Sequence, residues 1–235
     1  MAFIASMTFI LNFFKEVFRK GIFPGVQKLE SSISQAPKTA ISQGQMLFGG
    51  ITSATIAAMA RSVVCIDRSR CFNPIFLGKD WTIWQGPPDG DGMVGQEDQD
   101  SRSLAITQLD LSKIVLETTL QDNELSIDGE KKLMRLKAVG HIIRLDAGIL
   151  MALLQNREAV PASWAKSVHG KTSNIFFDGT VLRSPEGFRC TLCLCCQSSQ
   201  WVFVCNRQAA QWFGNDYSAV LHCPKGKLVT GSFPF

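Results

Sequence analysis

The stretch that decides the fold is residues 188–206, FRCTLCLCCQSSQWVFVCN, in which two runs of strand-forming residues flank the polar connection QSSQ. Runs of this kind, separated by a short polar connection, predict an antiparallel β-hairpin. The connection pairs Cys196 with Trp201 and Leu194 with Phe203. Because side chains alternate along a strand, this register assigns each residue of the hairpin to one of two faces.

Both faces of the predicted hairpin are largely apolar. What we call the leucine face consists of Leu192, Leu194, Trp201 and Phe203. What we call the cysteine face consists of Thr191, Cys193, Cys195, Val202 and Val204. A solvated antiparallel sheet shows one polar face, so we expect both of these faces to be covered. Helices between Gly129 and Lys166 are expected to cover one face, whereas the face with Val202 and Val204 is expected to meet the N-terminal segment, a second subunit or a ligand.

Helical patterns precede the hairpin and strand patterns surround it. We expect one helix from Gly129 to Gly140, a second after the capping residue Asp146 and a third beginning at Pro161. After Thr172, strand-forming runs alternate with turn signals, of which Asp178-Gly179 is expected to be a hairpin turn. The predicted fold class is therefore α+β, with helices followed by an antiparallel β-meander of about four strands.

Composition divides the chain into segments. The expected divisions are an apolar, helical N-terminal segment (1–66), a connecting segment (67–85), an acidic Gly/Pro-rich linker (86–102), a compact α+β domain (103–222) and a C-terminal tail (223–235). The linker is expected to be mobile, because it has little apolar surface to offset the ordering of its backbone. The uncharged run 1–14 is shorter than the roughly 18–20 residues that span a bilayer. We therefore expect the N-terminal segment to pack on the cysteine face or to mediate association.

The charge and the cysteines bear on the compartment and on partners. The chain has a net charge of +4 and eight cysteines, most of them crowded near its C-terminal end. Such crowding is not the spacing of a disulfide framework, and the N-terminus lacks the basic region of a secretory signal. We expect a cytoplasmic protein, with peripheral membrane association of residues 1–66 as the alternative. The basic residues from Lys131 to Arg144, including Lys132, are expected to face water and the acidic segment.

Thiolates with C-x₂-C spacing can hold zinc, so the clustered cysteines are the first metal candidates. The candidate zinc ligands are Cys190, Cys193, Cys196 and Cys205. In a strand, however, Cys190 and Cys196 share one face and Cys193 lies on the other. We therefore predict that the cluster binds no stoichiometric metal.

Four carboxylates in the acidic segment resemble part of a calcium-binding loop. Asp89, Asp91, Glu97 and Asp100 match positions 1, 3, 9 and 12 of that loop. Position 5 needs an oxygen ligand and position 6 needs glycine, but the chain has Met93 and Val94 there. A solvated acidic loop is the expected outcome, and no cofactor is expected for the chain as a whole.

The run from Phe176 to Leu182, FFDGTVL, resembles the phosphatase motif of the haloacid-dehalogenase family. Phosphoryl transfer in that family needs a nucleophilic aspartate two residues before Asp178, where this chain has Phe176. The sequence therefore does not predict this activity.

Three further motifs carry a resemblance to a family: RLDA at 144–147, VPASW at 160–164 and IFFDGTVLRSP at 175–185. On these motifs the chain resembles an uncharacterised family of hypothetical proteins from candidate-phylum bacteria, over about residues 80–221. The resemblance implies a recurring domain in uncultured bacteria and brings no activity, cofactor or site residue. The chain departs from the family at several clustered cysteines, where members usually carry Tyr, Val or Trp, and in continuing past Leu221.

No combination of acid, base and nucleophile is visible in the sequence, so it predicts no catalytic residues. The expected function is a non-enzymatic binding or protein-interaction module with an apolar sheet face. The alternatives are a small enzyme of unidentified class and a membrane-associated accessory protein acting through residues 1–66. Nucleic acid is not an expected partner, because the basic residues are not interleaved with a series of stacking aromatics.

Overall fold

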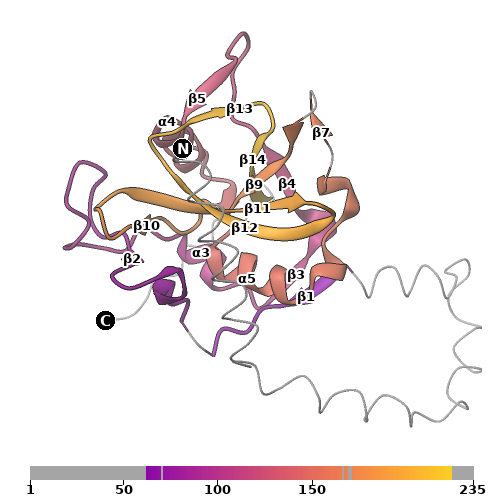
Figure 1. Ribbon diagram of the computed structural model, residues 1–235, viewed down its shortest axis with the longest axis horizontal. Coiled ribbons are helices and arrows are strands. Elements are labelled where there is room, and N and C mark those ends of the chain that lie inside the picture. The colour runs from indigo at the N-terminus through magenta and orange to yellow at the C-terminus, as the bar shows by residue number, and fades with distance from the viewer. Residues whose placement is uncertain (1–61, 70, 166, 169–170, 224–235) are drawn as a thin grey trace, which may run out of the picture. The chain divides into compact units, whose positions relative to one another are not determined.

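The computed structural model describes residues 62–69, 71–165, 167–168 and 171–223, which form short helices and mostly antiparallel strands (Figure 1). The strands are β1 (Val63–Cys65), β2 (Thr82–Ile83), β3 (Gln108–Asp110), β4 (Val115–Glu117), β5 (Ser126–Asp128), β6 (Ile142–Arg144), β7 (Ser167–Val168), β8 (Lys171–Thr172), β9 (Asn174–Phe176), β10 (Leu182–Arg183), β11 (Arg189–Gln197), β12 (Gln200–Arg207), β13 (Gln211–Phe213) and β14 (Asp216–His222). The helices are α3 (Ser101–Leu104), α4 (Gly129–Ala138) and α5 (Ala147–Gln155), with the 3-10 helices η4 (Pro74–Leu77), η5 (Leu111–Lys113), η6 (Arg157–Ala159) and η7 (Ala162–Ala165). The predicted α+β class is confirmed.

The helix expected within residues 1–61 and the tail from residue 224 onward lie outside the described residues. Among the residues that the structure describes, no helix is both long and apolar enough to cross a membrane.

β11 and β12 form the predicted hairpin, and Leu194 lies opposite Phe203 as the sequence indicates. Ser198 and Ser199 make the turn, with φ angles of 49° and 63°. Positive φ at both turn residues is the geometry of a type I′ turn, whose twist matches that of the flanking strands. The hairpin and its register are therefore confirmed.

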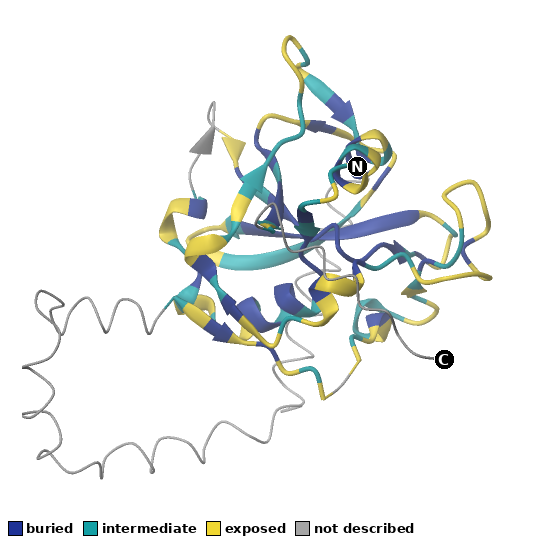
Figure 2. Cartoon of the chain, turned by 180° about the vertical axis from the view of Figure 1, so that it is seen from behind, coloured by how far each residue is buried: buried dark blue, intermediate teal, exposed yellow. Residues whose placement is uncertain are grey.

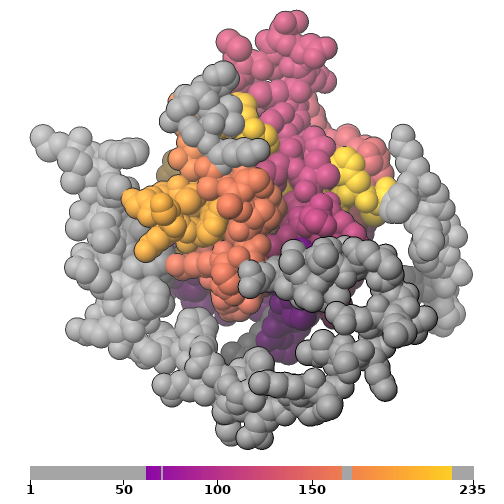
Figure 3. Space-filling model, turned by 90° about the vertical axis from the view of Figure 1, so that its right-hand side faces the viewer, coloured from indigo at the N-terminus to yellow at the C-terminus, as the bar shows by residue number. Residues whose placement is uncertain are grey.

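The hairpin is part of the main sheet, whose strand order is β2-β10-β11-β9-β14-β4. β12 lies along the other edge of β11, and β6 also pairs with β14. All pairs in this sheet are antiparallel except β9 with β14, which run parallel. The pairing of β14 with β4 brings the yellow C-terminal strand against the magenta middle of the chain, and Figure 3 shows these colours in contact on one face.

The hairpin turn expected at Asp178-Gly179 is wrong. β9 and β10 do not pair with each other, and both lie antiparallel beside β11, as one strand interrupted at residues 177–181. Asp178-Gly179 forms a turn, in which the Thr180 N–H donates to the Phe177 carbonyl oxygen, but this turn does not join two paired strands. Gly179 also allows a close approach, because a Cβ atom there would lie 2.3 Å from the Arg144 carbonyl oxygen. Its N–H donates to the Leu145 carbonyl oxygen at 2.9 Å. The meander is therefore broken at this point by contact with the chain around β6.

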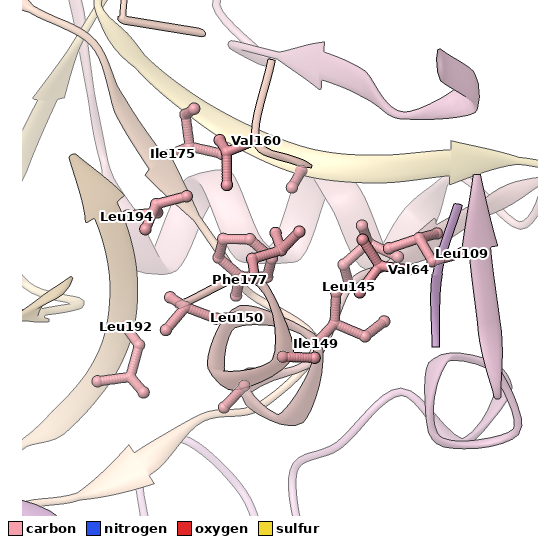
Figure 4. Packing of buried hydrophobic residues seen from close by; sticks show 14 of the residues in the cluster. Val64, Leu109, Leu145, Ile149, Leu150, Val160, Ile175, Phe177, Leu192 and Leu194 are labelled. Carbon is pink, nitrogen blue, oxygen red and sulfur yellow. The ribbon is translucent and has the colours of Figure 1, made fainter. Parts of the chain in front are cut away.

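The leucine face of the hairpin lies over the main hydrophobic core, which α5 covers from the other side (Figure 4). Leu192 and Leu194 are fully buried there, as are Ile149 and Leu150 of α5. Burying one such side chain contributes roughly 1.5–3 kcal/mol. The Asp146 carboxylate caps α5 by accepting from the Gly148 and Ile149 N–H groups, as its sequence position predicts. A helix from the expected region does cover one face.

The cysteine face is covered in part by a smaller group of the chain's own residues. Cys193, Phe176, Trp212 and Ile127 are buried together, and Val204 packs against them. Burial falls from β11 to the edge strand β12, as the change from dark blue to teal in Figure 2 shows.

The described domain begins well before residue 103. β1 pairs with β3, so that the buried side chains of Val64 and Leu109 lie opposite each other, and β2 pairs with β10. Arg68 also reaches the buried Asp146, with an ion pair of 2.9 Å. Residues 62–85, expected to end one segment and connect to the next, are thus part of the same hydrophobic and ionic network.

The acidic segment, expected as a linker, forms a loop attached to this domain. The Gly86 N–H donates to the Gln96 carbonyl oxygen at 2.9 Å, and Asp100 caps α3. Asp98 pairs with Lys137 at 2.7 Å and with Arg189 at 2.9 Å. The expectation that basic residues face the acidic segment is confirmed for Lys137. The end of this segment is thus held to the domain by ion pairs and a helix cap, although its acidic composition predicts solvated side chains.

Candidate functional site

A polar cluster is buried on the cysteine face of the sheet. Lys132 of α4, Asp178 and Ser218 are all buried, and Lys132 is 0% exposed. The Lys132 Nζ lies 3.9 Å from Asp178 Oδ2, and the Ser218 hydroxyl donates to that same oxygen. The expectation that Lys132 faces water is therefore wrong.

Two aromatic rings lie close to the ammonium group of Lys132. The Nζ lies 4.8 Å from the ring centroid of Phe176 and 4.1 Å from that of Trp212, close enough for cation–π attraction. The two rings are stacked, with centroids 3.8 Å apart. Burial lowers the pKa of Lys132 from its ordinary 10.5 to about 8, although the carboxylates of Asp178 and Asp216 act in the opposite direction.

The local sequence explains why α4 buries a lysine. Lys132 and Leu136 are four residues apart on a helix, so their side chains lie on the same side, and both are buried. Gly129 lets the helix begin close to the chain before β13, because a Cβ there would lie 2.3 Å from the Gln208 carbonyl oxygen. Trp212 of β13 then lies beside the first turn of α4 and above Phe176.

The buried cluster has the residue types of a catalytic site without access to a substrate. Lys132 Nζ and Asp178 Oδ1 make no hydrogen bond with any described residue. A lysine whose pKa is lowered toward neutrality, near a hydroxyl group, can act as a base. Such a base must come within hydrogen-bonding reach of its substrate, and the side chains of Lys132 and Asp178 are each 1% exposed. In this conformation the cluster supports the wall of a pocket.

That pocket is a cavity of about 290 Å³, and Phe176 and Trp212 are part of its lining. It lies where β8, β9, β12, β13 and β14 come together at one end of the cysteine face. Its lining combines aromatic rings with amide and charged side chains: Phe176, Trp212, Phe213, Asn174, Asn206, Asn215, Gln211, Asp216 and Lys171, together with Ala210. A few convergent polar groups above an aromatic floor are typical of sites for small ligands.

The asparagine side chains of the pocket are held by hydrogen bonds. Asn174 Nδ2 donates to Asp216 Oδ1 at 2.8 Å, and Asn215 Nδ2 donates to the Thr172 carbonyl oxygen at 3.1 Å. Asn206 Nδ2 lies 3.5 Å from the Cys193 sulfur. The second oxygen of Asp216 accepts the backbone N–H of Phe213 at 2.7 Å. The polar wall is therefore oriented before any ligand arrives.

A second cavity, of about 330 Å³, adjoins the first and shares Lys171, Phe213 and Asn215 with it. Its remaining lining includes Leu120, Leu125 and Glu124. Glu124 is held by Arg135 and Lys131, whose charges and hydrogen bonds keep the pKa of its carboxyl far below the ordinary range. Phe213 thus lines both cavities.

The structure places the candidate zinc ligands on different faces of the hairpin. Cys190 and Cys205 belong to the core under the leucine face, whereas Cys193 belongs to the group on the cysteine face. Cys196 is half-buried near the turn. The predicted division of the thiols between two faces is confirmed.

The candidate calcium ligands are also separated. Asp91 accepts the Met93 N–H, Glu97 bonds to Gln99, and Asp89 is exposed at the end of the loop. Asp100 is buried, and burial by itself raises the pKa of its carboxyl. Hydrogen bonds and charges from Arg102 and Arg144 outweigh this effect, so the pKa lies below its ordinary value. Among the described residues, no group of three or more His, Cys, Asp or Glu side chains is arranged to hold a metal ion.

Sequence reasoning missed both the pocket and the buried lysine. The three asparagines come from separate elements, so no motif joins them. One local signal was present for Lys132: it shares the side of α4 on which Leu136 falls. Charged residues are rare on the buried side of a helix, so a lysine at this position marks a candidate site.

Comparison of the chain with models of known protein families, with curated proteins and with solved structures finds no match.

Proposed function

We propose that the protein is a binding module that holds a small polar ligand in the pocket above Phe176 and Trp212. The observation that carries the proposal is the convergence of Asn174, Asn206 and Asp216 from three strands around one cavity. These side chains are held in place by hydrogen bonds within the protein, and a few oriented polar groups beside aromatic rings are typical of sites for small ligands.

The same geometry argues against catalysis in the pocket. Each oxygen of Asp216 already accepts a hydrogen bond from the protein, one from Asn174 and one from Phe213. Lys132, whose pKa is lowered to about 8, is buried and is not part of the pocket lining. General acid–base catalysis needs a group that is free to exchange a proton with the ligand. Lys132 does not line the pocket, and the carboxylate of Asp216, which does line it, is held by its two protein donors.

Association with a protein through β12 is a second candidate function. In the described sheet β12 pairs with β11 alone, and its residues from Trp201 to Cys205 are apolar and half-buried. Such an edge strand can receive a strand from another chain. Sedimentation at increasing concentration tests this second candidate, and a monomer throughout, with no change after Val202→Lys, would count against self-association.

Binding in the pocket is tested with a defined set of sugars, amines, amino acids and nucleosides, measured by ligand-observed NMR. The test variant is Asn206→Ala, which removes one amide from the pocket wall. The matched control is Gln200→Ala, an exposed amide at the other end of the same strand. We expect at least one compound to bind the wild type and the control and to lose binding in Asn206→Ala. Absence of binding by all compounds, or binding that Asn206→Ala leaves unchanged, would contradict the proposal.

A further inference from the structure

The orientation of two amide groups in the pocket is fixed by their partners. A carboxylate and a backbone carbonyl oxygen are acceptors only, so the atoms of Asn174 and Asn215 that bond to Asp216 and Thr172 must be the nitrogens. The carbonyl oxygen of each amide, Oδ1, remains for a ligand. No described residue donates a hydrogen bond to either oxygen, and the pocket wall is therefore rich in acceptors.

The charges around the pocket place one cation at its rim. Within the described lining, Asp216 is the single carboxylate and Lys171 the single cation. The Lys171 Nζ lies 5.1 Å from the centroid of the Phe213 ring, which is 44% exposed. Behind the aromatic floor, the charge of Lys132 is offset by Asp178 at 3.9 Å. Without Lys171 the immediate surroundings would thus carry the uncompensated charge of Asp216.

An ammonium group complements these features. It carries three donors and no acceptor, and the pocket offers two amide oxygens together with the carboxylate of Asp216. Hydrogen bonds to a charged group are stronger than those between neutral groups. The exposed face of Phe213 adds cation–π attraction, which its contact with Lys171 already shows.

We infer that the ligand of this pocket carries a primary ammonium group, which takes the place of the Lys171 ammonium over the Phe213 ring. The inference rests on the proposed binding function and names the chemical class of its ligand. Free amines, amino sugars and lysine side chains all present this group, so the experiment must distinguish these sources.

The experiment compares three ammonium compounds with neutral counterparts of similar shape by isothermal titration calorimetry on the full chain. The pairs are putrescine and 1,4-butanediol, glucosamine and glucose, and Nα-acetyl-lysine amide and Nα-acetyl-norleucine amide. We expect one ammonium compound to bind about tenfold more tightly than its neutral counterpart, the size of a charged hydrogen bond. The pair that shows the difference identifies the source of the ammonium group.

Lys171→Met provides the sharpest variant, because it removes the competing cation from an exposed position and is expected to tighten binding. The expected gain is about threefold, typical of one exposed charge. The matched control is Lys113→Met, since the Lys113 side chain is 75% exposed and belongs to η5, which is not part of the pocket lining. Asp216→Asn should abolish the preference for the ammonium compound, with its fold checked by circular dichroism.

Each outcome decides the inference. If each charged compound binds only as tightly as its neutral counterpart, the inference that the ligand carries an ammonium group is overturned. The proposed binding function would remain intact. Unchanged affinity in Lys171→Met would show that Lys171 does not occupy the ligand position, which also overturns it. If none of the six compounds binds the wild type or Lys171→Met, the inference fails, and the broader NMR set then decides separately whether the pocket binds any ligand.

Discussion

β11 is buried on both sides, but its two faces are built from different chemistry. On the leucine face, Leu192 and Leu194 pack into a core that α5 covers. On the cysteine face, Cys193 packs with Phe176 and Trp212, which lie close to a lysine paired with Asp178. The leucine face is stabilised by the removal of apolar surface from water. The cysteine face also depends on the positions of an ammonium group, a carboxylate and a hydroxyl group.

This difference determines how each face contributes to stability. Burial of apolar side chains is non-directional and contributes roughly 1.5–3 kcal/mol for each leucine. A buried ion pair must first overcome the loss of hydration of both charges, and its net contribution is often near zero. We therefore expect the ion pair of Lys132 and Asp178 to contribute little net stability compared with an apolar pair. Its contacts with Phe176 and Trp212 support two residues of the pocket wall instead.

The largest expected effect comes from separating the buried ion pair. Lys132→Met removes the cation and leaves the Asp178 carboxylate buried with Ser218 alone. We expect the free energy of unfolding to fall by about 3–5 kcal/mol, the usual cost of an uncompensated buried charge. Adding Asp178→Asn should recover most of that loss, because the double variant contains no unpaired charge. Urea denaturation of the three proteins measures both changes.

The control for this experiment lies on the other face. Leu194→Ala should cost about 2–5 kcal/mol through lost burial and a cavity. Asp178→Asn should not rescue it, because the two residues do not share an interaction and their effects should add. If Lys132→Met is no less stable than the double variant, the cysteine face does not depend on this ion pair, and the contrast between the faces disappears.

Alkaline pH provides a smaller effect on the same lysine. The pKa of Lys132 is about 8 in the folded protein and 10.5 ordinarily, so between these pH values the unfolded chain binds more protons. Stability then rises with pH in this window, because the folded protein releases the proton of the desolvated Lys132 at a lower pH than the unfolded chain does. The total gain is at most about 3.5 kcal/mol relative to Lys132→Met, from about 1.4 kcal/mol per pH unit.

The measurement is the unfolding free energy of wild type and Lys132→Met at several pH values from about 7 to about 11, which bracket both pKa values. The difference between the two proteins isolates this one residue from the other titratable groups, which both proteins share. A difference that stays constant with pH would mean that Lys132 keeps an ordinary pKa and is not desolvated.

The parts of the fold that the sequence predicts are those set by near neighbours. The register of the hairpin follows from a short polar connection, and the cap of α5 follows from Asp146 and the residues directly after it. The interruption at Asp178-Gly179 depends on the carbonyl oxygen of Arg144, which is distant in sequence. The same dipeptide suits a hairpin turn, so local pattern alone cannot separate the two outcomes.

The candidate site was hidden for the same reason. Asn174, Asn206 and Asn215 are ordinary polar residues until separate strands and a turn bring them to one cavity. Trp212 is one of five tryptophans, and only its stacking on Phe176 marks it. The metal candidates, by contrast, were visible as motifs, and the structure separates them, because spacing in sequence does not fix which way side chains point.

The smallest expected effect tests the turn that sets the two faces. Ser198 and Ser199 have positive φ angles, which serine adopts less readily than asparagine and glycine. The double substitution Ser198→Asn with Ser199→Gly introduces the dipeptide that type I′ turns favour. It should raise the free energy of unfolding by about 1 kcal/mol, since the native backbone is then less strained. Urea denaturation of the double variant and the wild type measures the change.

The control for the turn is Ser163→Gly, because Ser163 is exposed in η7 and has no positive φ. Glycine there should lower stability by a few tenths to about 1 kcal/mol, since it only adds freedom to the unfolded chain. A loss of stability in the double variant would indicate a different turn. A turn longer by one residue would shift β12 by one position, and every side chain of that strand would change face. Val202 and Val204 would then exchange sides with Phe203, which would end the distinction between the leucine face and the cysteine face on β12.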